Sequence, residues 1–135
     1  MLLTWDFLLN YDYLIPLPKE VRTTDMLIDY NNWKENTIIK NNIEINDYLH
    51  NKYVLNRNYC IEMNPFPYNV DKNIFHYVLW INNKYRNTVT NKEIVDIITD
   101  KMIKLNYNGY ICFENHIDCK SVNKILHYQV FFRKC

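Results

Sequence analysis

Near its end, the 135-residue chain reads Ile125-Leu126-His127-Tyr128-Gln129-Val130-Phe131-Phe132. Successive side chains of a β-strand point to opposite faces, so residues two apart share a face. The face that holds Leu126 is apolar throughout, and we expect it to pack on a helix. The opposite face places the His127 imidazole beside the Gln129 carboxamide. This polar pair on an otherwise apolar strand is the first candidate for a functional site.

Helical patterns occur before and within the region that leads to this strand. A helix is predicted from Thr23 or Thr24 through Trp33, because a threonine N-cap precedes an acidic residue in the first turn. A second, short helix is predicted over 43–53 from apolar residues at helical spacing. The sequence Thr90-Asn91-Lys92-Glu93 is typical of a capping box, and it predicts a longer helix that reaches Leu105.

Strand patterns fill the second half of the chain. Alternating or branched and aromatic residues predict strands at Tyr59–Met63, Phe75–Ile81, Tyr110–Glu114 and Ile125–Phe132. Turns are predicted at 64–69, where two prolines fix the backbone, and at Asn108-Gly109. The order of elements predicts an α+β fold with an antiparallel sheet of about four or five strands, in which the last two strands pair. We expect residues 1–57 to form a helical N-terminal extension and 58–135 the core.

The composition excludes several familiar sites. The chain has one glycine (Gly109), one serine (Ser121), one glutamine (Gln129) and no alanine, whereas it has 21 asparagines. A single glycine excludes both glycine-rich phosphate loops and the Gly-x-Ser-x-Gly nucleophile turn. The bias toward Asn, Ile, Lys and Tyr indicates an AT-rich genome, such as that of a large DNA virus, a protist parasite or certain bacteria. A net charge of +1 argues against extensive contact with a nucleic-acid backbone.

Apolar runs and cysteine spacing bear on the location of the protein and on metal binding. No run approaches the ~20 apolar residues of a membrane helix, and the first nine residues lack the leading positive charge of a signal peptide. Cys60, Cys112, Cys119 and Cys135 do not have the spacing of a zinc site. We therefore expect a cytoplasmic protein (in the host cytoplasm, if viral) with free thiols, no membrane contact, no metal and no cofactor.

Four histidines are candidates for chemistry. His50 and His116 lie in polar, loop-like segments, where we expect them to face solvent. His76 and His127 lie in apolar strand patterns, where a buried imidazole stays neutral. One interpretation is a core histidine bonded to a backbone carbonyl. The other is an imidazole that attacks phosphorus or acts as a base, with the Gln129 amide bonding a phosphoryl oxygen.

Two resemblances bear on this choice. Over nearly the whole chain, the sequence resembles the fungal N-acetylglucosamine-induced protein family. The matching blocks are Trp5, Arg22-Thr23, Asp29-Tyr30, Trp33, Ile45–Leu49, Asn64–Tyr68, His76–Trp80, Ser121-Val122, His127 and Val130.

More distantly, residues 60–135 resemble the histidine-triad fold of nucleotide hydrolases and transferases. This resemblance implies that His127 holds the nucleophile position, the middle of three. It places Gln129 third, as in the galactose-1-phosphate uridylyltransferase branch. The pattern departs from the fold in having Ile125 first, Phe75 where glycine is usual, and one extra residue between Ser121 and His127.

The resemblance also extends the candidate site. It implies that His76, Gln129, Asn115, Ser121 and Arg133 contact the ligand. Lys120 and Lys124 would join Arg133 in offsetting phosphate charge. The alternatives remain open: Asn115 and Ser121 as turn residues, and the three cations as ordinary surface charges.

Three hypotheses follow. The first is a small domain that binds a nucleotide or sugar phosphate, with His127 forming a covalent nucleotidyl intermediate if it is active. The second is a non-catalytic binding or adaptor protein on the same fold. The third is single-stranded nucleic-acid or cap binding through aromatic stacking. The expected partner is a small phosphorylated ligand, a nucleotide or nucleotide sugar.

Overall fold

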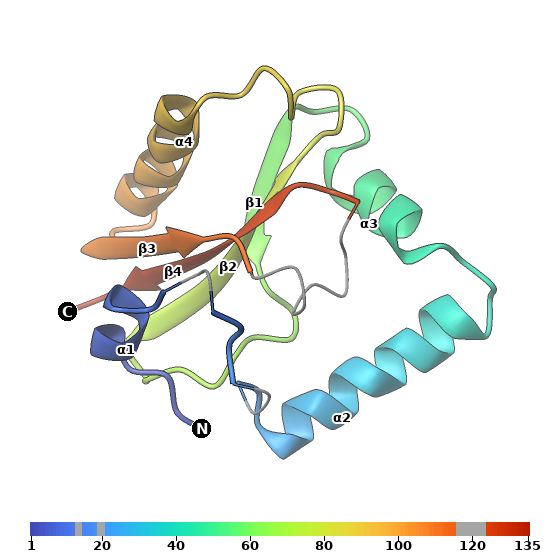
Figure 1. The fold of residues 1–135 in the computed structure, drawn as a ribbon, viewed down its shortest axis with the longest axis horizontal. Helices are drawn as coiled ribbons and strands as arrows, with labels where there is room; N and C mark the ends of the chain where they lie inside the picture. Colours follow the sequence, from blue (N-terminus) through green and yellow to red (C-terminus); the bar gives the residue numbers. More distant parts are fainter. Residues whose placement is uncertain (13–14, 19–20, 116–123) are drawn as a thin grey trace.

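The structure, a computed structural model, describes residues 1–12, 15–18, 21–115 and 124–135. In chain order the elements are α1 (Trp5–Leu9), α2 (Thr24–Trp33), the π-helix η1 (Lys34–Ile39), α3 (Ile45–Val54), β1 (Tyr59–Met63), β2 (Ile74–Ile81), α4 (Asn91–Lys104), β3 (Gly109–Phe113) and β4 (His127–Arg133). The four strands form one antiparallel sheet in the order β1-β2-β4-β3 (Figure 1). The predicted α+β class is confirmed.

The two central strands, β2 and β4, carry the polar residues that the sequence singled out. Trp80 lies opposite His127 in the register of this pair, and Val78 lies opposite Gln129. Strand β3 pairs with the other edge of β4, as predicted for the last two strands. Because both neighbours of β4 are hydrogen-bonded strands, the side chains of β4 are held in fixed positions on the two faces.

One face of the sheet packs on α4. Leu79 of β2 and Phe132 of β4 are fully buried there against Ile94 and Ile98 of the helix. This is the apolar face that the alternation of β4 predicted, and α4 covers it in Figure 1. Helix α4 begins at a complete capping box, in which the Thr90 side chain and the Glu93 side chain each bond the other's backbone N–H.

The opposite face is covered at its two ends and hollow between them. Near α1, Leu8 packs with Phe131. Near α3, Leu49 packs with Trp80 and Ile125. His127 and Gln129 lie on this face, so the predicted separation of apolar and polar faces is confirmed.

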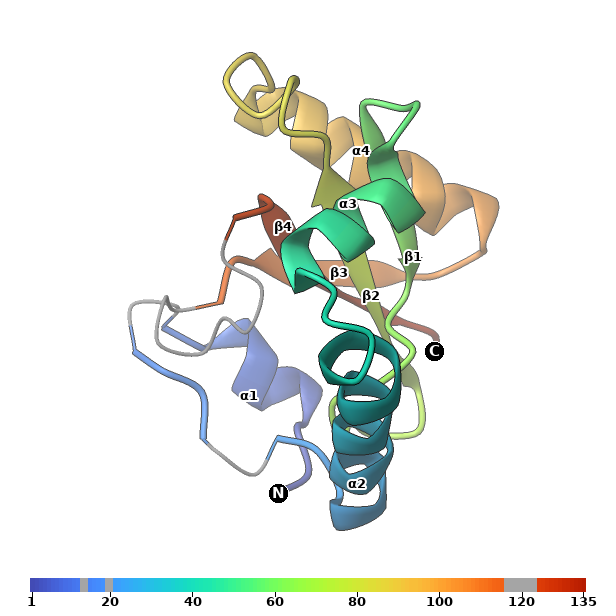
Figure 2. The same cartoon turned by 90° about the vertical axis from the view of Figure 1, so that its right-hand side faces the viewer.

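Helix α2 and the π-helix η1 follow each other directly and form one helical rod beside the sheet (Figure 2). The Thr23 side chain caps α2 by accepting from the N–H of Met26, as predicted. The rod continues into η1, which the sequence did not predict, and α2 itself has no buried residue. Leu3 forms a parallel bridge with Val70, and its N–H donates to Asn69 at 2.7 Å. The division at residues 57 and 58 stays a prediction.

The predicted turn at Asn108-Gly109 is wrong. The chain reverses after α4 at Asn106, whose φ of 60° is left-handed, whereas Gly109 is the first residue of β3 and has no positive φ. Asparagine tolerates the left-handed region better than most residues do, so no glycine is required there. Gly109 instead lies against Trp5, whose ring is 3.6 Å from where a Cβ would stand.

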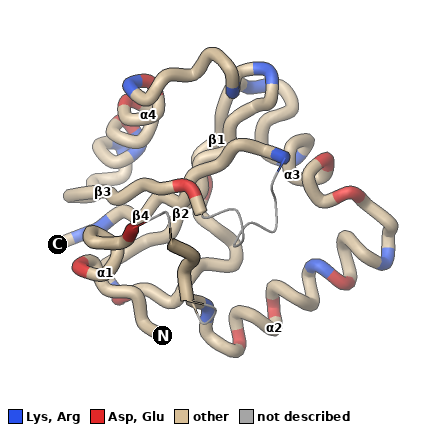
Figure 3. The backbone as a smooth tube through the Cα atoms, viewed as in Figure 1, with Lys and Arg blue, Asp and Glu red and all other residues tan. Residues whose placement is uncertain are grey.

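Charges of both signs are interspersed along the α2–η1 rod and along α4 (Figure 3), in keeping with the net charge of +1. No helix within the described ranges is long and apolar enough to span a membrane.

Replacing Thr90 with alanine is expected to lower the free energy of unfolding by about 1 kcal/mol, because the N-terminus of α4 loses its cap. Urea denaturation measures the change. The matched control is Thr24→Ala, at an exposed threonine that follows the N-cap of α2. It should change stability by less than about 0.5 kcal/mol. Equal effects of the two substitutions would contradict the capping assignment.

Candidate functional site

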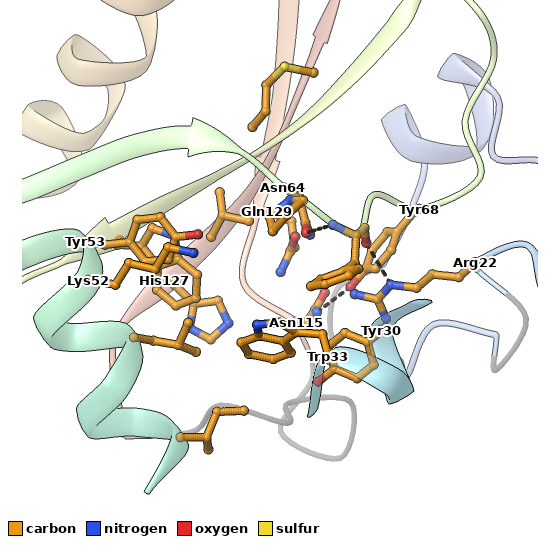
Figure 4. A pocket seen from close by; sticks show the side chains of 17 residues that line it. Arg22, Tyr30, Trp33, Lys52, Tyr53, Asn64, Tyr68, Asn115, His127 and Gln129 are labelled. Carbon is orange, nitrogen blue, oxygen red and sulfur yellow. Dashed lines mark hydrogen bonds between the residues drawn. The ribbon is translucent and has the colours of Figure 1, made fainter. Parts of the chain in front are cut away.

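A pocket with a cavity volume of about 230 Å³ opens on the polar face of the sheet (Figure 4). Strands β2 and β4 supply its floor, helices α2 and α3 supply two walls, and the proline turn after β1 supplies a third. The lining is strongly aromatic, with rings from Tyr30, Trp33, Tyr53, Phe66, Tyr68 and Trp80.

The charges that line the pocket are of one sign. Arg22 and Lys52 are cations, and none of the described lining residues is Asp or Glu. Figure 4 places the two cations at opposite ends, with Gln129 and Asn115 between them. A pocket with cations, flat aromatic walls and no carboxylate suits an anionic ligand that carries a ring.

His127 lies at the Lys52 end of the pocket, as Figure 4 shows. Its ring stacks on Trp80 at 5.0 Å between centroids, and Trp80 in turn stacks on Tyr53 at the same distance. The Nδ1 atom lies 2.8 Å from the carbonyl oxygen of Ile125. A carbonyl only accepts, so Nδ1 carries a proton, and in the neutral form of the ring the lone pair is on Nε2. The backbone of Ile125 is thus the orienting group that the sequence did not reveal.

Gln129 is held by the second strand histidine. The backbone N–H of Tyr68 donates to Nδ1 of His76 at 3.1 Å, so this ring carries its proton on Nε2. That proton is donated to Oε1 of Gln129 at 2.5 Å. The carbonyl oxygen of Gln129 therefore accepts from His76, and the amide N–H groups of Gln129 are left to face the pocket. His76 itself is 2% exposed and does not line the cavity.

The surroundings of His76 keep it neutral. Its ring lies between Tyr68 and Phe131, each 4.4 Å away between centroids. Desolvation by burial lowers the pKa of His76 from 6.5 to about 3, although the bond to Gln129 raises it, and the charge of Arg22 also lowers it. At neutral pH, His76 thus serves as a positioning group and not as a proton donor to a ligand.

Arg22 fastens the N-terminal segment to the proline turn. Its Nε donates to the carbonyl oxygen of Phe66 at 2.8 Å. Its guanidinium carbon lies 4.9 Å from the ring centroid of Tyr30 and 5.0 Å from that of Tyr68, distances typical of cation–π contacts. Arg22 therefore joins α2 and α3 among the residues before position 58 that line the pocket.

The structure gathers four of the six predicted site residues. His127, Gln129 and Asn115 line the pocket, and His76 lies directly behind Gln129. Arg133 is on the same sheet face but at the far end of β4, where its guanidinium lies 4.5 Å from the Trp5 ring centroid. Six residues of strand separate it from His127, or roughly 20 Å, so it does not reach the pocket.

Other predicted candidates fall elsewhere. Ser121, His116 and Lys120 lie outside the described residues. Lys124 and His50 border a separate polar hollow. His50 is half-buried and accepts the N–H of Asn83 at 3.4 Å in an exposed hydrogen bond.

Most residues of the pocket walls were not predicted as candidate site residues from the sequence. Arg22, Tyr30, Trp33 and the turn at 64–68 belong to the blocks shared with the fungal family, and they border the cavity. That resemblance was the signal that could have located them. Lys52 and Tyr53 gave no signal of their own, because a helical pattern does not reveal which residues face a neighbouring sheet.

The described parts of the chain contain no cluster of metal-binding side chains. No group of three or more His, Cys, Asp or Glu side chains is arranged there to hold an ion.

The depressed pKa of His76 predicts a specific loss of stability in acid. Between pH 6.5 and about 3 the unfolded chain binds a proton at this histidine and the folded chain does not. The contribution to stability is complete above pH 6.5 and falls by about 1.4 kcal/mol per pH unit below it. Urea denaturation of the wild type and of His76→Gln at several pH values isolates this slope as their difference. A difference that does not change between pH 7 and pH 4.5 would contradict the assignment.

Removing Gln129, the hydrogen-bond acceptor of His76, should also lower the free energy of unfolding. Gln129→Met leaves the buried Nε2–H of His76 without an acceptor, and we expect a loss of about 1–3 kcal/mol in the free energy of unfolding. In a His76→Phe background the same substitution should cost clearly less, since no donor is stranded. Equal costs in the two backgrounds, measured by urea denaturation, would show that the two side chains are not coupled.

Comparisons with known proteins address the family and the fold. No curated protein matches the chain in sequence. Among solved structures, the crystal structure of HTC1 is similar, with a TM-score of 0.60 and 18% sequence identity over 87% of this chain and 77% of that one. At this identity the likeness concerns the fold alone. The model of a family described as protein of unknown function (DUF3605) matches residues 14–133, which include every residue described above as lining the pocket. The chain belongs to the DUF3605 family.

Proposed function

We propose that the pocket binds a small phosphorylated ligand, a nucleotide or a nucleotide sugar, with its phosphate against His127 and Gln129. The observation that carries this proposal is the arrangement of these two side chains. The bond from Nδ1 to Ile125 places the lone pair of His127 on Nε2, and the bond from His76 turns the amide N–H groups of Gln129 away from the buried strand. A lone pair and an amide donor on neighbouring positions suit a phosphorus atom and its oxygen.

The charges and rings of the pocket support the same ligand. Lys52 lies at the His127 end and offsets phosphate charge, and no described carboxylate in the lining opposes it. Trp33 and Phe66, whose centroids are 5.5 Å apart, supply an aromatic wall for a base or sugar.

The catalytic form of the proposal is nucleotidyl transfer. Nε2 of His127 attacks the α-phosphorus, a P–N bond forms, and the bond to the leaving phosphate oxygen breaks with its electron pair on that oxygen. Gln129 donates to the oxygen on which charge develops. The oxygen of water or of a second phosphate then bonds to phosphorus, and the P–N bond breaks with its electron pair on Nε2, which restores the neutral imidazole; when water attacks, its proton is released to solvent. Because His76 is neutral and holds its only proton against Gln129, the scheme requires a leaving group that departs without protonation, such as a phosphate.

A second candidate is a non-catalytic binding module with the same pocket. It is favoured by Ile125, which holds the first place of the resembled triad, is 2% exposed and packs in the core beside Trp80. An aliphatic side chain at this place brings no proton-transfer group to the ligand.

Three finer assignments belong to this proposal. Membership of the N-acetylglucosamine-induced group is supported by the position of its matching blocks, since Arg22, Trp33 and the turn at 64–68 border the pocket. A degenerate histidine-triad fold is supported by the placement of His127 and Gln129 on a central strand. A cytoplasmic location fits Cys60, Cys112 and Cys135, which are free thiols.

Incubation with a panel of nucleoside diphosphates, triphosphates and sugar nucleotides tests the catalytic form. We expect intact-protein mass spectrometry to show a nucleotidyl adduct that is lost in acid, and His127→Ala to abolish it. His50→Ala, which removes a histidine beside the other hollow, is the matched control and should keep the adduct. Ligand binding without any adduct, retained in His127→Ala, would favour the binding module. Absence of binding by every phosphorylated ligand would overturn the proposal.

A further inference from the structure

Asn115 holds a polar atom that the fold does not use. This residue follows β3, lines the pocket and is 8% exposed. Its Nδ2 donates to the hydroxyl of Tyr68 at 2.9 Å, whereas its Oδ1 is buried without a hydrogen-bond partner among the described residues. A buried carbonyl oxygen without a donor is unfavourable, so such an atom beside a cavity indicates the place of a ligand donor.

The residues around Asn115 indicate which kind of ligand group carries the hydrogen-bond donor. Figure 4 shows Asn115 between Trp33 and Tyr68. Phe66 stands 5.5 Å from Trp33 and 5.4 Å from Tyr30 between centroids, so rings bound this end of the pocket. Aromatic faces accept a flat base or the apolar face of a sugar.

A phosphate does not satisfy this oxygen. Above pH 7 a phosphomonoester is mostly dianionic and has acceptors only, because its second pKa is about 6. It would oppose Oδ1 of Asn115, whereas the Gln129 amide and the Lys52 ammonium offer donors elsewhere in the pocket. Arg22 is compatible with a neutral ring here, since its guanidinium already lies by the rings of Tyr30 and Tyr68 and its Nε bonds Phe66.

Resting on the proposed function, we infer that the ligand has a fixed direction in the pocket. Its phosphate lies at the His127 end, and a ring that carries an N–H or O–H donor lies at the Asn115 end and bonds Oδ1. Two sources supply this chemistry, a nucleobase N–H and a sugar hydroxyl. Asn115 is then the residue that distinguishes a ring-bearing phosphate ester from phosphate alone.

Calorimetric titration of the full chain at pH 8 tests this inference with four probes: adenosine 5′-monophosphate, uridine 5′-monophosphate, glucose 1-phosphate and inorganic phosphate. The readout is the ratio of the affinity for each ring-bearing probe to that for inorganic phosphate. We expect at least one ratio of about ten or more, because a buried acceptor gains its donor. A high ratio for the nucleotides identifies a base as the source, and a high ratio for glucose 1-phosphate identifies a sugar.

Two variants separate the effect of the hydrogen bond to Oδ1 of Asn115 from the effect of the shape of this side chain. Asn115→Leu removes the acceptor and should bring the ratio close to one. Asn115→Asp keeps an acceptor oxygen, and its added charge weakens all the phosphate probes together, so the ratio should persist. Thermal unfolding with and without inorganic phosphate verifies that each variant is folded. If either variant is unfolded, Tyr68→Phe, which releases Nδ2 of Asn115 from its anchor, should lower the ratio instead.

A ratio near one in the wild type, an unchanged ratio in Asn115→Leu, or a gain of phosphate affinity in that variant would overturn the inference. These results leave the proposed function standing, because phosphate still binds. Failure of all four probes to bind overturns both.

Discussion

The hydrogen bond from the backbone N–H of Tyr68 to Nδ1 of His76 determines the polarity of the pocket floor. A backbone N–H can only donate, so this bond assigns the proton of His76 to Nε2, and Nε2 can then only donate to Gln129. The proline turn at 64–68 is thus connected through one ring to the central strand β4. Because His76 is 2% exposed, water does not compete for these bonds.

The two strand histidines sit on neighbouring strands and have opposite proton arrangements. His76 is protonated on Nε2 and is used inside the protein, whereas His127 is protonated on Nδ1 and borders the cavity. Both rings stack on aromatic partners from their own sheet face, Phe131 for His76 and Trp80 for His127. The bond of His127 to a backbone carbonyl matches the first interpretation of the sequence, and its place in the lining of the pocket is what the second interpretation requires.

Alternation along β4 was enough to predict which residues face α4 and which face the pocket, since strand geometry has a period of two. The capping box at Thr90 likewise located the start of α4. Asn106 could not be foreseen as the reversal point, because a helix exit can use asparagine as well as glycine. Arg133 was misplaced for a different reason: sharing a face with His127 says nothing of the distance along the strand. The pocket walls depend on contacts between distant segments, such as Arg22 with Phe66, which local patterns do not encode.

Nitrogen-15 NMR of the histidine side chains at pH 7 tests the central claim most directly. We expect opposite tautomers: a protonated Nε2 with an unprotonated Nδ1 at His76, and a protonated Nδ1 with an unprotonated Nε2 at His127. Substitution of each histidine assigns the signals. The same tautomer at both rings, or a charged imidazolium at His76, would contradict this expectation.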